Sequence, residues 1–115
     1  MSLTVGNQKI LALARANEVR VGVAGERRRI AYLSYVDGCR LLAEMLADPS
    51  EMLLSARIGW LLLSVRGVGR VKVSPLLNRA GVRSWDRHVR DLSDRQRRLL
   101  VEILRESADV RESHS

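Results

Sequence analysis

A glycine turn between two helical segments carries the residues of this sequence best suited to chemistry. Gly67 and Gly69 stand one residue apart, and Arg66, Arg70 and Lys72 flank them. Glycine tolerates a positive φ and lets another molecule approach its backbone closely. A helix that begins just after the turn adds unpaired N–H groups and the positive end of its dipole, which together favour an anion. The pattern predicts a phosphate site, with the valine between the glycines anchored in the core. A plain helix–helix connection is the alternative.

The charge of the chain also favours a polyanionic partner. Its 115 residues include 20 Lys and Arg against 13 Asp and Glu, which gives a formal net charge of +7. The excess lies in residues 57–105, the part that holds the turn. A content of 46% hydrophobic and 29% charged residues is typical of a soluble globular domain. Nucleic acid is the commonest partner of such a chain, and an anionic membrane surface is the second.

Helical patterns dominate the part of the chain ahead of the turn. Ser34 is a candidate N-cap for the helix that follows it. Asp48 and Pro49 are suited to begin another helix, and an apolar stripe from Leu54 predicts that it continues without a break to Val65. A weak stripe over residues 7–20 predicts a helix there as well. Two glycines after it predict a break or a short extended piece near residues 21–24.

Two more helices are predicted after the turn. The first is short and ends at Gly81, the residue type favoured for a left-handed C-terminal cap. Ser74 and Pro75 interrupt it, so this helix either starts late, with Ser74 as its cap, or is kinked. A polar connection follows, and a capping box of Ser93 and Gln96 begins the last helix. The fold class predicted from these patterns is all-α.

Catalysis and metal binding are not expected. Cys39 is the single cysteine and is predicted to be a small buried apolar group. His88 and His114 are far apart, and no nucleophile stands in a recognisable catalytic context. We therefore expect no enzyme, no cofactor and no metal. No apolar run approaches the roughly 20 residues of a membrane span, and the first 20 residues do not resemble a signal peptide, so a cytoplasmic location is expected.

The stretch from Ser50 to Leu104 resembles a known family. It contains LLLSVRGVGRVKVSPLLNRAGV and, further on, RHVRDLSDRQRRLLVEIL. Both are similar to the helix-two-turns-helix region of actinobacterial integration host factor, a small basic nucleoid-associated protein. The stretch is more distantly similar to the bacterial small-subunit head protein that binds ribosomal RNA. The resemblance implies an all-helical domain that bends or compacts duplex DNA with little sequence preference and assists site-specific recombination.

The candidate DNA-binding residues are the cations and glycines of the two turns, together with two arginines that begin the last helix. The resemblance implies contacts at Gly67, Gly69, Arg70 and Lys72 in the first turn and at Arg87 and Arg90 in the second. Two positions depart from the family, since His88 replaces an arginine and Arg66 replaces a proline or lysine. Arg95 and Arg98 oppose the helix dipole, a placement that makes sense if a phosphate approaches there.

The remaining aromatic and basic residues have competing interpretations. Trp60 is predicted to be a core residue of its helix. Trp85 is predicted to pack over the two turns, and a wedge into kinked DNA is the alternative. The three arginines of residues 26–30, ERRRI, are predicted to form a solvated helix face, and a second phosphate contact from the N-terminal arm is the alternative.

These observations predict a small helical domain with three parts. Residues 1–33 form an N-terminal helical arm, residues 34–106 the helix-two-turns-helix DNA-binding domain, and residues 107–115 a flexible tail. The expected partner is double-stranded DNA, bound by a monomer in the nucleoid, with a site-specific recombinase as a second partner and no membrane. An RNA-binding protein of ribosomal type and a regulatory module that recruits other proteins are the alternatives.

Overall fold

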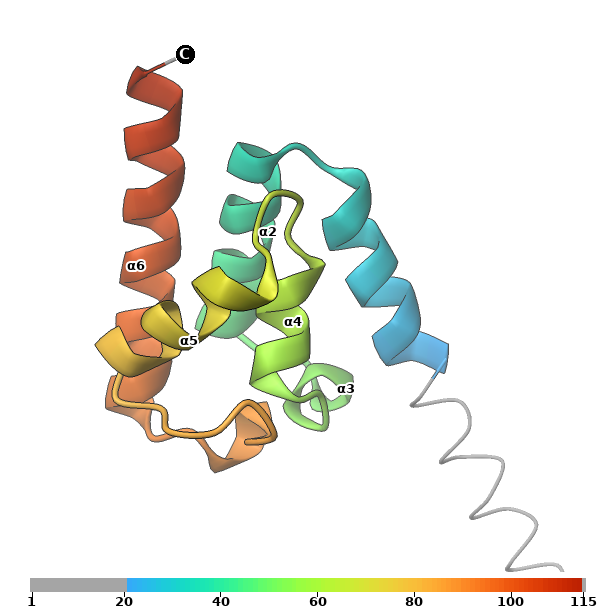
Figure 1. Ribbon diagram of the computed structural model, residues 1–115. Helices are drawn as coiled ribbons and strands as arrows, with labels where there is room; N and C mark the ends of the chain where they lie inside the picture. Colours follow the sequence, from blue (N-terminus) through green and yellow to red (C-terminus); the bar gives the residue numbers. More distant parts are fainter. Residues whose placement is uncertain (1–20, 115) are drawn as a thin grey trace, which may run out of the picture.

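The chain folds into an all-helical domain, as predicted. The computed structural model describes residues 21–114, and within this range no β-strand forms. Residues 21–32 are helical and lead into the other elements shown in Figure 1. In chain order these are α2 (Tyr35–Ala47), α3 (Glu51–Leu54), α4 (Ile58–Ser64), α5 (Arg70–Arg79), the short 3-10 helix η1 (Val89–Asp91) and α6 (Asp94–Ser113).

Helix α6 packs along α2 in the most extensive contact between two of the elements described above (Figure 1). Arg40 of α2 reaches across to α6, where it lies 3.1 Å from a carboxylate oxygen of Asp109 and 2.8 Å from one of Glu112. The hydrogen bond from Arg40 lowers the pKa of the Glu112 carboxyl. Ala108 is fully buried beside these pairs. The expectation of a flexible tail over residues 107–115 is therefore wrong for residues 107–113, which continue α6.

Two helices, α3 and α4, replace the single long helix predicted ahead of the first turn. The Ser50 side chain caps α3 by accepting a hydrogen bond from the Leu53 amide, so Asp48 is not the cap. The helical pattern then breaks between α3 and α4, where the Ala56 carbonyl accepts a hydrogen bond from the Val89 amide. Bonds to a segment 30 residues away along the chain thus replace the helical bonds that the apolar stripe predicted.

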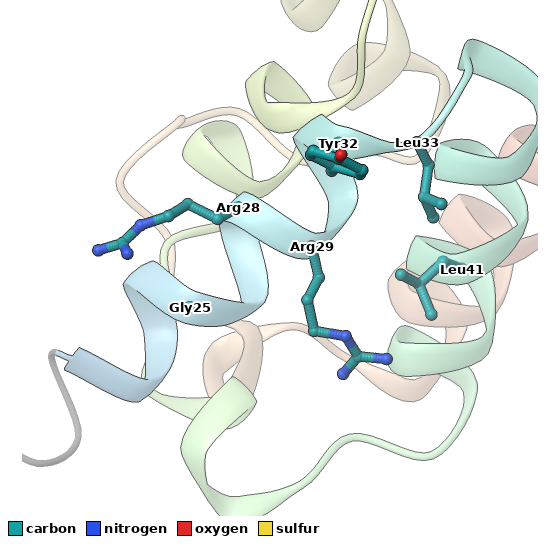
Figure 2. Close-up of a pocket in the computed structure, with 6 residues that line it drawn as sticks. All are labelled: Gly25, Arg28, Arg29, Tyr32, Leu33 and Leu41. Atoms are coloured by element: carbon teal, nitrogen blue, oxygen red, sulfur yellow. The ribbon is translucent and has the colours of Figure 1, made fainter.

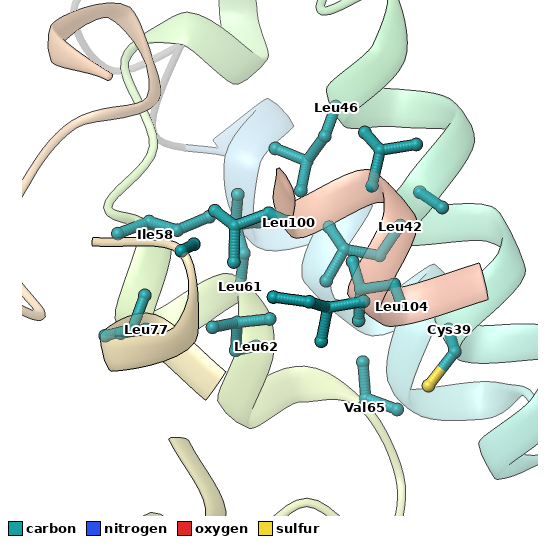
Figure 3. Packing of buried hydrophobic residues seen from close by; sticks show 14 of the residues in the cluster. Cys39, Leu42, Leu46, Ile58, Leu61, Leu62, Val65, Leu77, Leu100 and Leu104 are labelled. Carbon is teal, nitrogen blue, oxygen red and sulfur yellow. The ribbon is translucent and has the colours of Figure 1, made fainter. Parts of the chain in front are cut away.

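One hydrophobic core joins these elements. Figure 3 shows side chains of α2, α4, α5 and α6 packed against one another. The apolar stripe of α4 contributes buried residues as predicted, and Cys39 is buried at 1% exposure. The largest fully buried side chains are Ile30, Leu42, Leu46, Leu53, Ile58, Leu61, Leu62, Leu77, Leu100, Leu104, Val65 and Val73.

The helix over residues 21–32 contributes Ile30 to this core. No break or extended piece occurs near residues 21–24, although two glycines lie there. The cost of these glycines in a helix is about 1 kcal/mol each, and packing against the rest of the domain offsets it. Gly22, for example, lies directly against the side chain of Met52. The helix predicted over residues 7–20 lies outside the described residues.

Helix α5 begins at Arg70, directly after the first turn, so the alternative of a late start with Ser74 as the cap is wrong. Pro75 stands inside the helix. The predicted end at Gly81 is confirmed, since Gly81 has a φ of +76°. The amides of Gly81 and Val82 donate to the carbonyls of Asn78 and Leu77, a pattern that satisfies the last carbonyl groups of a helix.

Candidate nucleic-acid interface

The first turn, residues 65–69, connects α4 to α5 and matches the predicted geometry. Gly67 has a φ of +87°, which only glycine adopts easily, whereas Gly69 is extended and serves as the N-cap residue of α5. Val68 is buried at 6% exposure and anchors the turn in the core, as predicted. Its amide donates to the Val65 carbonyl, so this N–H group is not available to a ligand.

The N-terminus of α5 presents amide groups that no side chain satisfies. Within the described residues, no side chain caps the start of α5. The Lys72 amide donates to the Gly69 carbonyl at 3.0 Å, and the amides ahead of it have no partner inside the helix. An ideal Cβ on Gly69 would meet no heavy atom within 4 Å, so the backbone is open on this side. The turn thus offers donors and the positive end of a dipole at an accessible point.

The cations of the first turn are exposed and free of carboxylates. Arg66, Arg70 and Lys72 form no ion pair with any residue in the described part of the chain. No acidic residue occurs anywhere between Glu51 and Asp86 in the sequence. The ammonium group of Lys72 donates to the Gly67 carbonyl at 3.2 Å, which holds it over the turn. The local field around the turn is therefore positive.

The second connection, residues 82–92, is fixed to the N-terminus of α4 by backbone hydrogen bonds. The amides of Ile58 and Gly59 donate to the carbonyls of Arg87 and Trp85, at 2.9 and 3.0 Å. Arg57 also forms an isolated antiparallel bridge with His88. The second connection therefore lies at the start of α4 and the first turn at its end, as Figure 1 shows. With seven residues, α4 separates them by about 10 Å.

The predicted cations of the second connection are exposed or half-buried, but each already has a partner. Arg87 donates to the Asp91 carbonyl at 2.7 Å, and Arg90 donates to the Leu54 carbonyl at 3.3 Å. The His88 ring lies 3.6 Å from the Asp91 carboxylate. These bonds orient the side chains and leave other guanidinium N–H groups free to donate. Arg83, which the sequence did not single out, is exposed here as well.

Arg95 and Arg98 lie in the first turns of α6, directly after the second connection. Both are exposed, and the Arg98 side chain donates to the Asp94 carbonyl at 3.3 Å. The predicted capping box of Ser93 and Gln96 is present. These two arginines thus directly follow the second connection at the start of α6.

Trp60 of α4 and Trp85 of the second connection lie next to each other. Trp60 is half-buried, so its predicted place in the core is wrong: it lies at the edge of the core, beside the ring of Trp85. Trp85 was predicted to pack over the two turns, and the structure shows it packed on the start of α4, with its Cα and Cβ against Gly59. The Trp85 indole N–H donates to the Ser74 hydroxyl at 3.1 Å.

The three arginines of ERRRI have different surroundings. Arg27 donates to the Ser64 hydroxyl at 3.3 Å, while Arg29 pairs with Glu26 at 2.9 Å. Arg28 is exposed. Arg28 and Arg29, drawn in Figure 2, line a surface hollow of about 610 Å³ between the helix over residues 21–32 and α2. The prediction of a solvated face thus fits Arg28 and Arg29 better than Arg27.

A solved structure shares this arrangement of helices. The structure of sIHF bound to an 8 bp palindromic DNA is similar to this chain, with a TM-score of 0.57 and 23% sequence identity. The match covers 81% of this chain and 97% of that chain. The chain has the fold of sIHF. No family model matches the sequence, and no curated protein matches it.

Residues 21–114 contain no group of three or more His, Cys, Asp and Glu side chains placed to hold a metal ion. None of their helices is both long enough and apolar enough to cross a membrane.

Proposed function

We propose that this protein binds duplex DNA through its sugar-phosphate backbone, with little sequence preference, as a nucleoid-associated protein of the integration host factor type. The observation that carries the proposal is the uncapped N-terminus of α5 beside three cations that no carboxylate among residues 21–114 neutralises. Backbone amides, a helix dipole and mobile cations are the groups that position a protein on phosphates without reading bases. The shared fold with sIHF, whose solved structure contains DNA, supports the proposal.

The spacing of the two basic segments also suits a duplex. The first turn and the second connection lie at opposite ends of α4, about 10 Å apart. One strand of a duplex carries a phosphate every 3.4 Å along the helix axis, so this distance corresponds to about three phosphate steps. Contacts at Gly67, Gly69, Arg70 and Lys72 would thus fall on one part of a strand, and those at Arg87 and Arg90 a few nucleotides away.

Bending or compaction of the bound DNA and assistance to a site-specific recombinase are parts of this proposal. They follow from the resemblance to integration host factor. We also expect a monomer, and we expect no catalytic activity because the sequence places no nucleophile in a recognisable catalytic context. A duplex incubated with the protein should remain intact on a denaturing gel. Fluorescence energy transfer between dyes at the two duplex ends should increase on binding if the DNA bends.

The dependence of duplex affinity on salt tests the proposed contacts. Five to seven phosphate contacts predict that log K falls against log salt with a slope of about −4.5 to −6. Each of Arg70→Ala and Lys72→Ala should flatten the slope by about one unit and weaken binding to all sequences alike, because each removes one phosphate contact. The measurement is fluorescence anisotropy of a labelled duplex at several salt concentrations.

A matched control is Arg105→Ala, which removes an exposed cation from α6 outside the proposed interface and should leave the slope unchanged. A slope that stays unchanged in the Arg70→Ala, Lys72→Ala double variant would contradict the assigned contacts. A hundredfold preference for structured RNA over duplex DNA, measured by competition, would favour the ribosomal-type alternative instead.

A further inference from the structure

Four side chains from separate segments form a cluster beside the first turn. The guanidinium carbons of Arg27 and Arg70 lie 5.6 and 5.7 Å from the ring centroid of Trp60. The rings of Trp60 and Trp85 meet edge to face, with their centroids 6.4 Å apart and an interplanar angle of 85°. We call these four residues the Trp–Arg cluster. It joins the helix over residues 21–32, α4, α5 and the second connection.

The cluster holds Arg27 at the entrance to the first turn. The Arg27 side chain donates to the hydroxyl of Ser64, the last residue of α4, and that hydroxyl donates to the Trp60 carbonyl. Within the described part of the chain, no carboxylate pairs with Arg27 or Arg70. Asp86, which follows Trp85, is paired with Arg57 at 3.2 Å. The two guanidinium groups thus keep their charge available.

Trp60 presents an accessible donor between these two cations. The indole N–H of Trp85 is bound to Ser74, whereas the indole N–H of Trp60 has no hydrogen-bond partner among residues 21–114 and is not sealed from solvent. A phosphate or sugar oxygen of bound DNA could accept a hydrogen bond from the Trp60 indole N–H. An apolar ring flanked by guanidinium groups is chemically matched to a deoxyribose with its two phosphates.

We propose that the Trp–Arg cluster is part of the DNA interface and that Arg27 and Trp60 are contact residues in addition to those of the two turns. The proposal rests on the proposed function. A duplex that touches both the first turn and the second connection must cross α4 between them, where Trp60 lies against Trp85 of the second connection. The DNA therefore lies across α4 and the start of α5, and the helix over residues 21–32 contributes a phosphate contact through Arg27.

Tryptophan fluorescence tests the position of the DNA, because both tryptophans of the chain belong to the cluster. Trp85→Phe leaves Trp60 as the single emitter, and Trp60→Phe leaves Trp85. Each variant is titrated with acrylamide, free and saturated with duplex, and saturation is established separately by anisotropy of a labelled duplex. We expect duplex to lower the quenching constant of Trp60 at least twofold.

The outcomes separate the two proposals. If the duplex binds but the quenching constants of both tryptophans stay unchanged, the cluster faces away from the DNA and this inference is overturned, while the proposed function stands. If the unaltered protein binds no duplex, both are overturned. Protection of Trp85 without protection of Trp60 would overturn the role of Trp60.

Two neighbouring arginines provide a matched pair for the charge contact. Arg27→Ala should flatten the salt slope by about one unit and weaken duplex binding about fivefold, since one phosphate contact is lost. Arg28→Ala removes an exposed arginine that lines the hollow in Figure 2, and it should change neither quantity. Equal effects of the two substitutions, or none from Arg27→Ala, would overturn the proposal. Arg27→Gln replaces the alanine variant if thermal unfolding shows that the latter is poorly folded.

Discussion

At the scale of single residues, two glycines with positive φ serve different purposes. Gly67 (φ +87°) shapes the first turn, and Gly81 (φ +76°) ends α5. An L-residue in this conformation costs roughly 1–2 kcal/mol, so Gly67→Ala and Gly81→Ala should each lower the free energy of unfolding by about that amount. Only Gly67→Ala should also weaken duplex binding, about tenfold, because the proposed phosphate contact uses the backbone of its turn. Urea denaturation and anisotropy of a labelled duplex measure the two effects.

Gly81→Ala is the control for the effect of Gly67→Ala on duplex binding. After correction for the folded fraction, Gly81→Ala should bind duplex as tightly as the unaltered protein. A similar loss of duplex affinity in both variants would contradict the proposed phosphate contact of the first-turn backbone.

At the scale of the elements, the position of the second connection depends on a close approach to α4. A Cβ on Gly59 would lie 2.7 Å from the Cβ and 2.9 Å from the Cα of Trp85, closer than packed atoms allow. Gly59→Ala should therefore cost about 2–3 kcal/mol of stability, the range typical of an overpacked contact. It should also weaken duplex binding, since Arg87 and Arg90 would shift. Thermal and urea unfolding measure the stability loss.

Gly25→Ala is the corresponding control in another helix. An added Cβ there would meet no heavy atom within 4 Å, and alanine favours a helix over glycine by about 1 kcal/mol. Gly25→Ala should raise the melting temperature. If Gly59→Ala and Gly25→Ala lowered the stability equally, the close approach of Trp85 to Gly59 would not explain the stability loss of Gly59→Ala.

At the scale of the whole molecule, the helix over residues 21–32 belongs to the same core as the rest of the domain. Ile30 is fully buried, together with Leu42 and Leu104. Ile30→Ala should lower the free energy of unfolding by about 2–4 kcal/mol, as for other large-to-small substitutions in a core. Far-UV circular dichroism and tryptophan fluorescence should then report one coincident transition. An unchanged midpoint would instead indicate that this helix is an independent arm.

The features that the sequence determined by itself are those decided within one or two helical turns. Ser34, Gly81 and the pair Ser93 and Gln96 mark helix ends as predicted, because caps bond to backbone groups at most five residues away. The first turn was predictable for the same reason. Gly67 allows its geometry, and the cations and free amides follow within a few residues.

Tertiary structure alone decided the features that depend on residues far apart in the chain. The break between α3 and α4 arises from backbone bonds to the second connection, which a stripe of leucines cannot reveal. Trp60 matches a core pattern, yet it is only half-buried at the edge of the core, where Trp85 and two arginines lie beside its ring. Arg27 reaches the first turn only because its helix packs against α4, 37 residues along the chain. Local rules specify which groups can meet a phosphate, and packing between distant segments decides which of them share one surface.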